Sequence, residues 1–321
     1  MEQIFSFELM ENPLVSVICL CYNQERFVKE ALDSVIGQSY SNIQLIVVDD
    51  ASTDGSKEVI LEWLNNTGDV SFVDLAENAG STTAFNKGLA LAHGDYVIDL
   101  AGDDILVPER IERQVNFFDE QSPLIGVIYS NAQYINEEGK ELHEHFEDLR
   151  LIPFEGDIYE RAIDTYFIPT PTMMIRKKVL DDLGGYDESL AYEDFDFWIR
   201  SARKWHYAYQ SEVLTLIRKV KGSHSTSFYE KNDRKLISTL TVCYKILDLN
   251  KTNEEVKALI KRLKYEIRHA FLAGKKTELS GFFLLWRKIE RIPNHYLIIK
   301  CIGQLSLNFS WLKRSILTLF R

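Results

Sequence analysis

The chain has 321 residues, of which 45% are hydrophobic and 26% are charged, as is usual for a globular protein. This length allows a full hydrophobic core in one large domain plus an appendage. The formal net charge is -11, yet residues 251–321 hold 15 Lys and Arg against 5 Asp and Glu, while residues 1–250 hold 22 and 43. The acidic main part argues against nucleic acid as a partner, and the basic end suits an anionic one.

The cysteines and the start of the chain favour a cytoplasmic protein. Cys19 and Cys21 lie two residues apart on one predicted strand, and Cys243 and Cys301 are distant in sequence, so reduced thiols are expected. Residues 1–12 are acidic and lack the basic start and apolar core of a signal peptide. No stretch reaches the roughly 18 apolar residues that a membrane-spanning helix needs.

Strands and helices alternate along the first two thirds of the chain. Apolar, β-branched runs predict buried strands, and apolar residues at helical spacing predict helices. Strands are expected at 15–21, 43–48, 70–75, 96–100, 124–135, 173–176 and 214–220, and helices at 26–36, after 55, at 82–92, after 108, at 179–183 and at 195–203. This order predicts an α/β fold with a doubly wound, mostly parallel sheet. Beyond Ser223 the pattern predicts helices with a basic surface.

Two of the predicted strands end in paired carboxylates, Asp49-Asp50 and Asp103-Asp104. The carboxyl ends of parallel strands meet at one edge of the sheet, where α/β folds bind ligands. Adjacent carboxylates repel one another unless a cation lies between them, and Mg²⁺ prefers one or two carboxylates together with substrate phosphates. The alternative is a simple turn, because Gly102-Asp103-Asp104 is also good turn chemistry.

Common nucleotide-binding signatures are absent. No phosphate-binding loop with its lysine is present, and no G-x-G-x-x-G follows the first strand, so kinase and classical dinucleotide functions lose their main support. The first strand ends instead in Leu20-Cys21-Tyr22-Asn23. An aromatic ring and an amide there suit a nucleobase, although a turn with a half-buried tyrosine is the alternative.

An ordered set of motifs resembles the family 2 glycosyltransferases. The set runs over residues 13–227, and its blocks lie at 15–23, 46–55, 78–80, 86–88, 94–104, 184–187 and 193–194. Each block is weak alone, but the ordered set is specific. The resemblance implies the GT-A fold, in which a Rossmann-like sheet is flanked by helices, and inverting transfer of a sugar from a nucleotide diphosphate.

The resemblance also assigns roles to individual residues. Asp50 would bind the base beside Leu20 and Tyr22, Asp103 and Asp104 would hold Mn²⁺ or Mg²⁺ on the diphosphate, and Asp194 would be the general base. An acceptor hydroxyl is a poor nucleophile, so a positioned carboxylate has to take its proton. The alternative for Glu193-Asp194 is capping of the following helix. The remaining residues expected to contact the nucleotide sugar are Asn23, Gly80 and Asn86.

The sequence departs from the family pattern in two places. The acid expected two residues before the Asp-Asp pair is Ala101, which leaves open whether Asp103 or Asp104 is the direct metal ligand. After the last strand, Arg218 and Lys221 are the candidates for neutralising the diphosphate. His224 is either a further metal ligand or an exposed loop histidine.

We therefore expect a catalytic domain at 1–227 and a helical, basic region at 228–321. The expected partners are a nucleotide-diphosphate sugar, with UDP as the first candidate, and a saccharide or lipid-linked acceptor in surface polysaccharide or glycolipid synthesis. The alternatives are a nucleotidyltransferase, although residues 20–26 lack its Gly-rich basic segment, and a non-catalytic scaffold, although the key carboxylates are present. Neither the sugar nor the linkage follows from the sequence.

The end of the chain mixes basic and bulky apolar residues. Residues 281–321 contain too many charges for a membrane span and too many Phe, Trp, Leu and Ile residues for an exposed helix. This composition is typical of helices in the membrane interface. We expect peripheral binding to the cytoplasmic face of the membrane, and the alternatives are packing on the catalytic domain or a homodimer contact.

Overall fold

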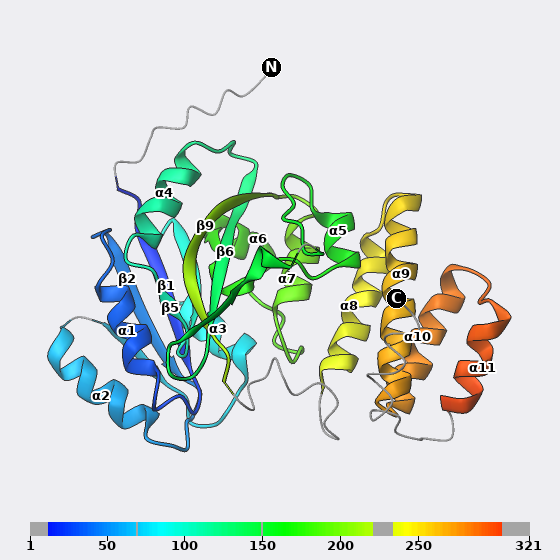
Figure 1. Cartoon of the computed structure of the whole chain (residues 1–321), viewed down its shortest axis with the longest axis horizontal. Helices are drawn as coiled ribbons and strands as arrows, with labels where there is room; N and C mark the ends of the chain where they lie inside the picture. The colour runs from blue at the N-terminus through cyan, green and yellow to red at the C-terminus, as the bar shows by residue number, and fades with distance from the viewer. Residues whose placement is uncertain (1–11, 69, 149, 221–233, 304–321) are drawn as a thin grey trace. The chain divides into compact units, whose positions relative to one another are not determined.

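The computed structural model describes residues 12–68, 70–148, 150–220 and 234–303 (Figure 1). These residues form two compact units. The first unit holds residues 12–158, 167–188 and 204–220, and the second holds 159–166, 189–203 and 234–303. This division differs from the expected boundary after residue 227, because two earlier segments group with the C-terminal helices.

The first unit contains a parallel half-sheet whose strands are ordered β3-β2-β1-β4. Its strands are β1 (Val15–Cys21), β2 (Ile43–Asp49), β3 (Ser71–Asp74) and β4 (Tyr96–Ala101), and its connecting helices are α1 (Val28–Ile36), α2 (Ser56–Thr67) and α3 (Ser81–Leu89). Strand β1 lies in the middle, with Leu20 opposite Val48 of β2 and Ala101 of β4. The carboxyl ends of β1, β2 and β4 are therefore neighbours, as the sequence predicts.

The other half of the sheet is mixed rather than parallel. It contains β5 (Ile105–Leu106), β6 (Ile125–Ile135), β7 (Glu141–Glu144), β8 (Met174–Arg176) and β9 (His206–Arg218), with helices α4 (Arg110–Asp119) and α6 (Lys177–Leu183) and 3₁₀ turns at His145–Glu147 and Thr170–Thr172. Strand β8 runs antiparallel to β4 and β6, whereas β6 and β9 are parallel.

Strand β9 begins well before the strand that the sequence predicts at 214–220. Gln210 pairs with Ser130, and the next pair joins Val213 to Asn131, so polar residues 211–212 form a bulge in β9. A bulge inserts extra residues without ending the strand. The polar interruption hid the first half of the strand from the hydrophobic pattern.

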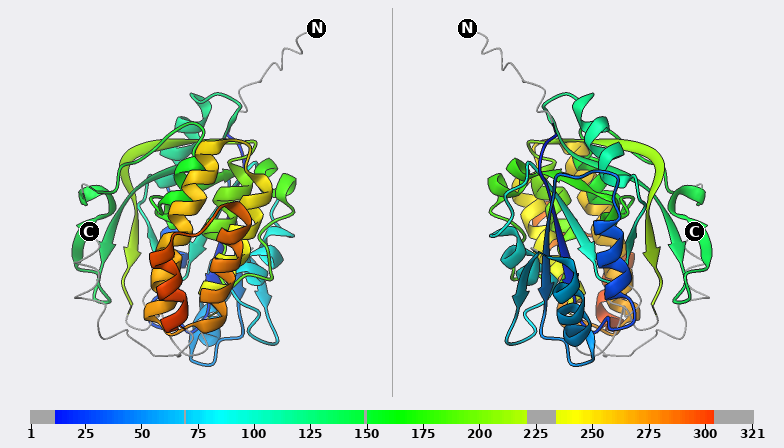
Figure 2. Two further views of the ribbon diagram at one scale, coloured as in Figure 1. Left: turned by 90° about the vertical axis from the view of Figure 1, so that its right-hand side faces the viewer. Right: turned by 90° about the vertical axis from the view of Figure 1, so that its left-hand side faces the viewer.

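The second unit is helical. It contains α5 (Tyr159–Asp164), α7 (Asp194–Ser201), α8 (Lys235–Leu249), α9 (Asn253–Leu272), α10 (Lys276–Ile289) and α11 (Asn294–Gly303). Helices α8 to α11 lie side by side (Figure 2). Helix α9 begins with a capping box in which Thr252 and Glu255 bond each other's backbone amides.

Part of the segment expected to bind the membrane is buried in helix α10. Phe282, Phe283, Leu285 and Trp286 are fully buried, and the helix packs against α8 and α9. These side chains therefore form the core of the helical unit. No helix among the described residues has both the length and the hydrophobicity to cross a membrane.

Candidate active site

Two adjacent carboxylates follow the end of β4. Asp104 is 3% exposed, and its Oδ1 accepts a hydrogen bond of 2.9 Å from the backbone N–H of Arg218. Burial and the neighbouring Asp103 raise the pKa of Asp104, and burial also raises the pKa of Asp103. A cation stabilises two adjacent carboxylates that are shielded from water.

A buried arginine near this acidic pair was not predicted. Arg110 is fully buried and donates to Gln114 Oε1 at 3.1 Å, to Thr215 Oγ1 at 2.8 Å and to the carbonyl oxygen of Met173 at 3.0 Å. Burial lowers its pKa to about 9, and the nearby negative charge of Asp104 opposes this shift. The sequence at position 110 carries no signal of burial, and only the packing of α4 against β6 and β9 shows that Arg110 is a buried anchor.

Arg218 is tied into the first unit. Its guanidinium group donates to the carbonyl oxygen of Asp103 at 3.0 Å and pairs with Glu30 at 2.6 Å. It also donates to two carbonyl oxygens at 136–137 and lies 4.8 Å from the centre of the Phe27 ring. Arg218 therefore anchors the end of β9 to α1 beside the acidic pair, and its side chain is 2% exposed.

Asp50 organises the loop that precedes α3. Its two carboxylate oxygens accept hydrogen bonds from the backbone N–H groups of Ala79 at 2.7 Å and Gly80 at 3.0 Å. Burial raises the pKa of Asp50, and these two amides oppose that shift. Gly80 has φ of 86°, a conformation that glycine adopts without strain. The expected base-binding residue thus fixes residues 78–80 at the edge of the sheet.

The loops after β1 and β2 are joined by side-chain hydrogen bonds. Asn23 Oδ1 accepts from the backbone N–H of Thr53 at 2.7 Å, and the N–H of Asn23 donates to Ser52 Oγ at 3.0 Å. Tyr22 follows the end of β1 and is 40% exposed. Leu20 is the one partly exposed residue of β1. Tyr22 is free to present a ring surface, whereas Asn23 holds the two loops together.

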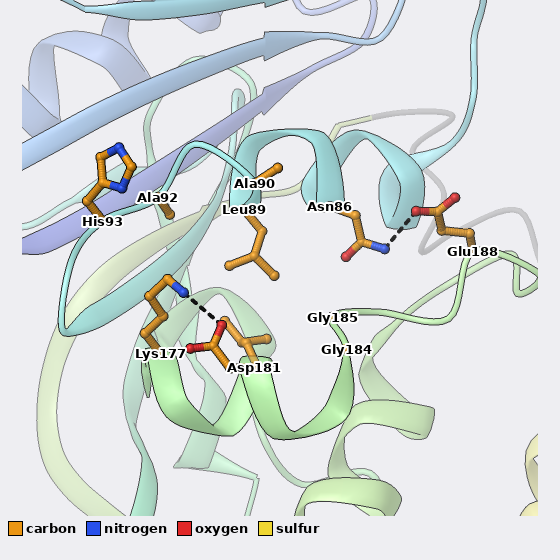
Figure 3. Close-up of a pocket in the computed structure, with 11 residues that line it drawn as sticks. Asn86, Leu89, Ala90, Ala92, His93, Lys177, Asp181, Gly184, Gly185 and Glu188 are labelled. Atoms are coloured by element: carbon orange, nitrogen blue, oxygen red, sulfur yellow. Dashed lines mark hydrogen bonds and ion pairs between the residues drawn. The ribbon is translucent and has the colours of Figure 1, made fainter.

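Asn86 connects α3 to the Gly-Gly turn. Its Nδ2 donates to the carbonyl oxygen of Tyr186 and to Glu188 Oε1, both at 2.9 Å, and its Oδ1 accepts from the N–H of Tyr186 at 2.9 Å. Gly185 has φ of 81°, and a Cβ there would lie 2.4 Å from Asn86 Oδ1. Asn86 borders a surface pocket of about 590 Å³ between α3 and α6, whose wall also carries the Lys177–Asp181 ion pair (Figure 3).

Asp194 is the first residue of α7 and belongs to the second unit. Its Oδ1 accepts from the backbone N–H of Phe195 at 2.6 Å, so it also satisfies part of the helix start. Burial and Glu193 raise the pKa of Asp194 to about 7, while the Phe195 N–H and Arg262 oppose the shift. A carboxylate with a pKa near the working pH is suited to general base catalysis.

Asp196, on the same helix turn, is a different kind of acid. It is 1% exposed, and its two oxygens pair with Arg200 at 2.6 Å and Lys245 at 2.5 Å. With one cation on each oxygen and almost no exposed surface, the Asp196 carboxylate is not accessible to a substrate. Asp196 is therefore a structural acid that joins α7 to α8.

The structure thus brings Leu20, Tyr22, Asn23, Asp50, Gly80, Asp103, Asp104 and Arg218 to neighbouring strand ends of the first unit. Asp194 lies in the second unit. Lys221 and His224 fall outside the described residues, so their expected roles remain predictions. Within the described residues no three His, Cys, Asp or Glu side chains converge as metal ligands.

The model of the family described as "Glycosyl transferase family 2" matches residues 16–184, which is more than half of the chain. The chain belongs to this family. A relative from Rickettsia typhi, an uncharacterized glycosyltransferase, is 31% identical over 204 residues, 63% of each chain. TuaG of Bacillus subtilis, provisionally named a teichuronic acid biosynthesis glycosyltransferase, is 29% identical over 67% of this chain and 82% of its own. The chain spans just under two thirds of the length of several curated relatives that it matches.

Solved structures share the fold. Staphylococcus aureus TarS 1–349 in complex with UDP-GlcNAc superposes with a TM-score of 0.61 at 20% identity, over 86% of this chain and 90% of that one. The mannosyltransferase PcManGT from Pyrobaculum calidifontis, in complex with GDP-Man and Mn²⁺, gives 0.60 at 19% identity over 90% and 79%. The predicted GT-A fold is confirmed.

Proposed function

We propose that this protein is an inverting glycosyltransferase that moves a sugar from a nucleotide diphosphate to a hydroxyl group. The observation that carries the proposal is the acidic edge of the first unit, where Asp103 and Asp104 follow β4 and Asp50 follows β2. Family membership and the complexes of the structural neighbours with UDP-GlcNAc and GDP-Man support it. A UDP-sugar is the first donor to test.

The acidic edge fits a divalent cation. Asp103 and Asp104 offer hard oxygen donors in a partly buried place that disfavours unpaired negative charge. Two carboxylates are an incomplete set, so diphosphate oxygens would supply further ligands. When bound, Mn²⁺ or Mg²⁺ would stabilise the negative charge of the departing diphosphate. The Mn²⁺ in the PcManGT complex supports this assignment.

In the proposed step, Asp194 removes the proton from the acceptor hydroxyl. The acceptor oxygen bonds to the anomeric carbon as the bond from that carbon to the diphosphate oxygen breaks, and the nucleoside diphosphate leaves. One in-line displacement inverts the configuration at that carbon. The proton ends on the Asp194 carboxylate, which a pKa of about 7 allows near neutral pH.

We further propose that the acceptor is a saccharide, attached to a lipid carrier, in surface polysaccharide or glycolipid synthesis. The name of TuaG supports a cell-surface polymer. A lipid-linked acceptor lies at the membrane, which fits a protein bound peripherally to its cytoplasmic face. The basic C-terminal part of the chain supports that location.

Nucleotide-sugar binding and transfer test the proposal together. A panel of nucleotide sugars that includes UDP-GlcNAc and GDP-Man, with Mn²⁺, should contain one that raises the melting temperature, because a ligand of the native state stabilises it. With that donor, Asp194→Asn should keep donor affinity and lose transfer by about 10²- to 10⁴-fold, the usual value of general base catalysis.

Glu193→Gln is the matched control, since it removes the neighbouring carboxylate and leaves the proposed base. It should retain most of the transfer activity. Transfer by the Asp194→Asn variant at nearly the normal rate would show that Asp194 is not the base. The absence of a stabilising nucleotide sugar would refute the donor class itself.

A further inference from the structure

A buried arginine from helix α9 lies against the start of α7. Arg262 is 3% exposed, and its guanidinium carbon is 4.1 Å from the centre of the Tyr166 ring and 4.6 Å from that of Phe195. Phe195 directly follows Asp194, and its N–H donates to the Asp194 carboxylate. Arg262 lies far beyond residue 184, where the family match ends.

The position of Arg262 is fixed on several sides. Its Nε is 2.9 Å from Glu266 Oε1, one helical turn further along α9. The Tyr166 ring packs edge-on against Phe195 at 5.2 Å, so both aromatic surfaces that hold the guanidinium group are themselves packed. A planar guanidinium group that is stacked on aromatic rings has little conformational freedom, so its positive charge stays in one place.

Helix α8 completes the surroundings of Asp194. The hydroxyl groups of Tyr166 and Tyr192 lie 3.4 Å apart, and Tyr192 Oη is 2.5 Å from Thr239 Oγ1 on α8. The negative charge of Asp194 contributes to raising the pKa of both phenols. Among the residues that the structure describes, the titratable and charged groups that interact electrostatically with Asp194 are Glu193, Tyr192, Tyr166 and Arg262, and Glu266 pairs with Arg262.

Among these groups Arg262 carries the positive charge. Glu193 and Glu266 are acids, and the two phenols are neutral near pH 7. A cation in a low-dielectric place stabilises a nearby carboxylate far more than it would in water. Burial alone would otherwise favour the protonated, catalytically inert form of Asp194.

We propose that Arg262, packed on the Phe195 ring next to Asp194, is a positioning residue that favours the charged form of the Asp194 carboxylate for proton abstraction. The C-terminal helices, outside the matched family segment, would then be part of the catalytic apparatus. The inference rests on the proposed function, because it assumes that Asp194 is the base.

The direction of the pKa shifts supports this role. Burial and Glu193 raise the pKa of Asp194 to about 7, and Arg262 opposes the shift. A base works in its deprotonated form, so transfer is present above this pKa and lost below it. Removal of the Arg262 charge raises the pKa further and therefore moves the acidic limb of the pH–rate profile to higher pH.

Three variants test the proposal through the pH dependence of kcat. Arg262→Met removes the charge and keeps apolar bulk, and it should move the acidic limb upward by about one pH unit, as loss of a nearby opposite charge does. Arg262→Lys keeps the charge and should leave the limb close to the wild-type position. Lys257→Met removes an exposed charge from the same helix and should change nothing, since its side chain is 75% exposed.

A reduced kcat with an unchanged acidic limb in Arg262→Met would overturn the proposal and leave Arg262 a purely structural role. An equal shift in Lys257→Met would also overturn it, because the effect would then be one of net charge. If Arg262→Met does not fold, Arg262→Met/Glu266→Gln removes both members of the buried pair, and a smaller upward shift is expected because the opposing charge of Glu266 is lost as well.

A titration of the Asp194 carboxyl carbon by NMR, with the signal assigned from Asp194→Asn, separates this inference from the proposed function. The pKa should rise in Arg262→Met whether or not sugar transfer is detected. A shift in the titration without any transfer would refute the function and keep the electrostatic effect of Arg262 on Asp194. An unshifted titration alongside active transfer would refute the role of Arg262.

Discussion

At the scale of single residues, the two acids after β4 differ in burial, and this difference bears on the proposed cation site. Asp104 is almost fully buried, and its backbone hydrogen bond from Arg218 fixes its orientation. Asp103 keeps more access to solvent. This difference suggests that the two acids share the proposed cation unequally, with Asp104 as a rigid ligand held by the protein.

We therefore expect transfer to stop in excess chelator and to return when Mn²⁺ is added. Asp104→Asn should weaken Mn²⁺ binding by at least about 10-fold, because even the outer-shell partners of metal ligands have effects of that size. Calorimetric titration of Mn²⁺ in the presence of UDP measures this. Asp119→Asn, at an exposed acid on α4, is the control and should bind normally. Full turnover in chelator would assign the acidic pair another role.

Sequence reasoning found these carboxylates because each follows an apolar run that ends abruptly. It could not find the partners of Arg110 and Arg218, since Thr215, Met173 and Glu30 lie 63 to 188 positions away in the chain. An isolated arginine carries no signal of burial. Only the three-dimensional packing reveals that both are anchored close to the acidic pair.

At the scale of elements, helix α3 links two motifs that are distant in sequence. Its start follows Gly80, which Asp50 holds, and its last turns carry Asn86, which holds the turn at 184–188. The Phe85 ring stacks on Tyr186 at 4.2 Å, next to the Asn86 contacts. The sequence suggested donor binding for Asn86, but its amide is engaged on both sides by this turn.

We expect Asn86→Ala to loosen the 184–188 turn, because the N–H and carbonyl of Tyr186 both lose their hydrogen bond to Asn86. Hydrogen exchange at the Tyr186 amide should accelerate, and the free energy of unfolding should fall by about 1–3 kcal/mol, as for other unsatisfied polar groups. Asn86→Asp should be worse, since its carboxylate would face the Tyr186 carbonyl oxygen and Glu188.

Lys87→Ala is the control, at an exposed position one residue further along α3. It should leave the exchange at Tyr186 unchanged. Normal exchange at Tyr186 in Asn86→Ala would mean that the three hydrogen bonds do not stabilise the turn, and would return Asn86 to the expected role in binding the donor.

The hydrophobic pattern predicted which elements exist better than where they end. It gave the helix that the C-cap at Gly184 closes, where φ is 70°, because a glycine after a helical run is a local signal. It assigned α10 to the membrane interface, because a local pattern does not distinguish lipid from the buried faces of α8 and α9. Non-local packing decided that case.

At the scale of the whole molecule, the division into units places Asp194 together with helices α8 to α11 rather than with the strands that precede Asp50, Asp103 and Asp104. The family match covers the acidic edge, whereas Asp194 and its neighbours, apart from Tyr166, lie beyond residue 184. The C-terminal helices would then have two separate roles, the proposed support of Asp194 and the proposed contact with the membrane.

Helix α11 is the described part of that surface that best fits lipid. Leu297, Ile298 and Ile302 are 41%, 61% and 39% exposed. Arg287, Lys288 and Arg291, just before the helix, are also exposed. Apolar side chains flanked by basic ones suit the headgroup region of a membrane, where each nearby Lys or Arg contributes about 1 kcal/mol with anionic lipid.

We expect the full chain to float with liposomes that contain anionic lipid at low salt, and to remain unbound with neutral liposomes or at high salt, where the charges are screened. Leu297→Ser/Ile298→Ser should lower the bound fraction, because it removes the exposed apolar side chains and keeps every charge. Ile36→Ser/Leu61→Ser is the matched control, since it removes two residues that are 54% and 43% exposed on α1 and α2. If the full chain stays in solution with anionic liposomes, or if both double variants bind equally well, α11 does not contact the membrane, and a dimer contact becomes the hypothesis to test by sedimentation.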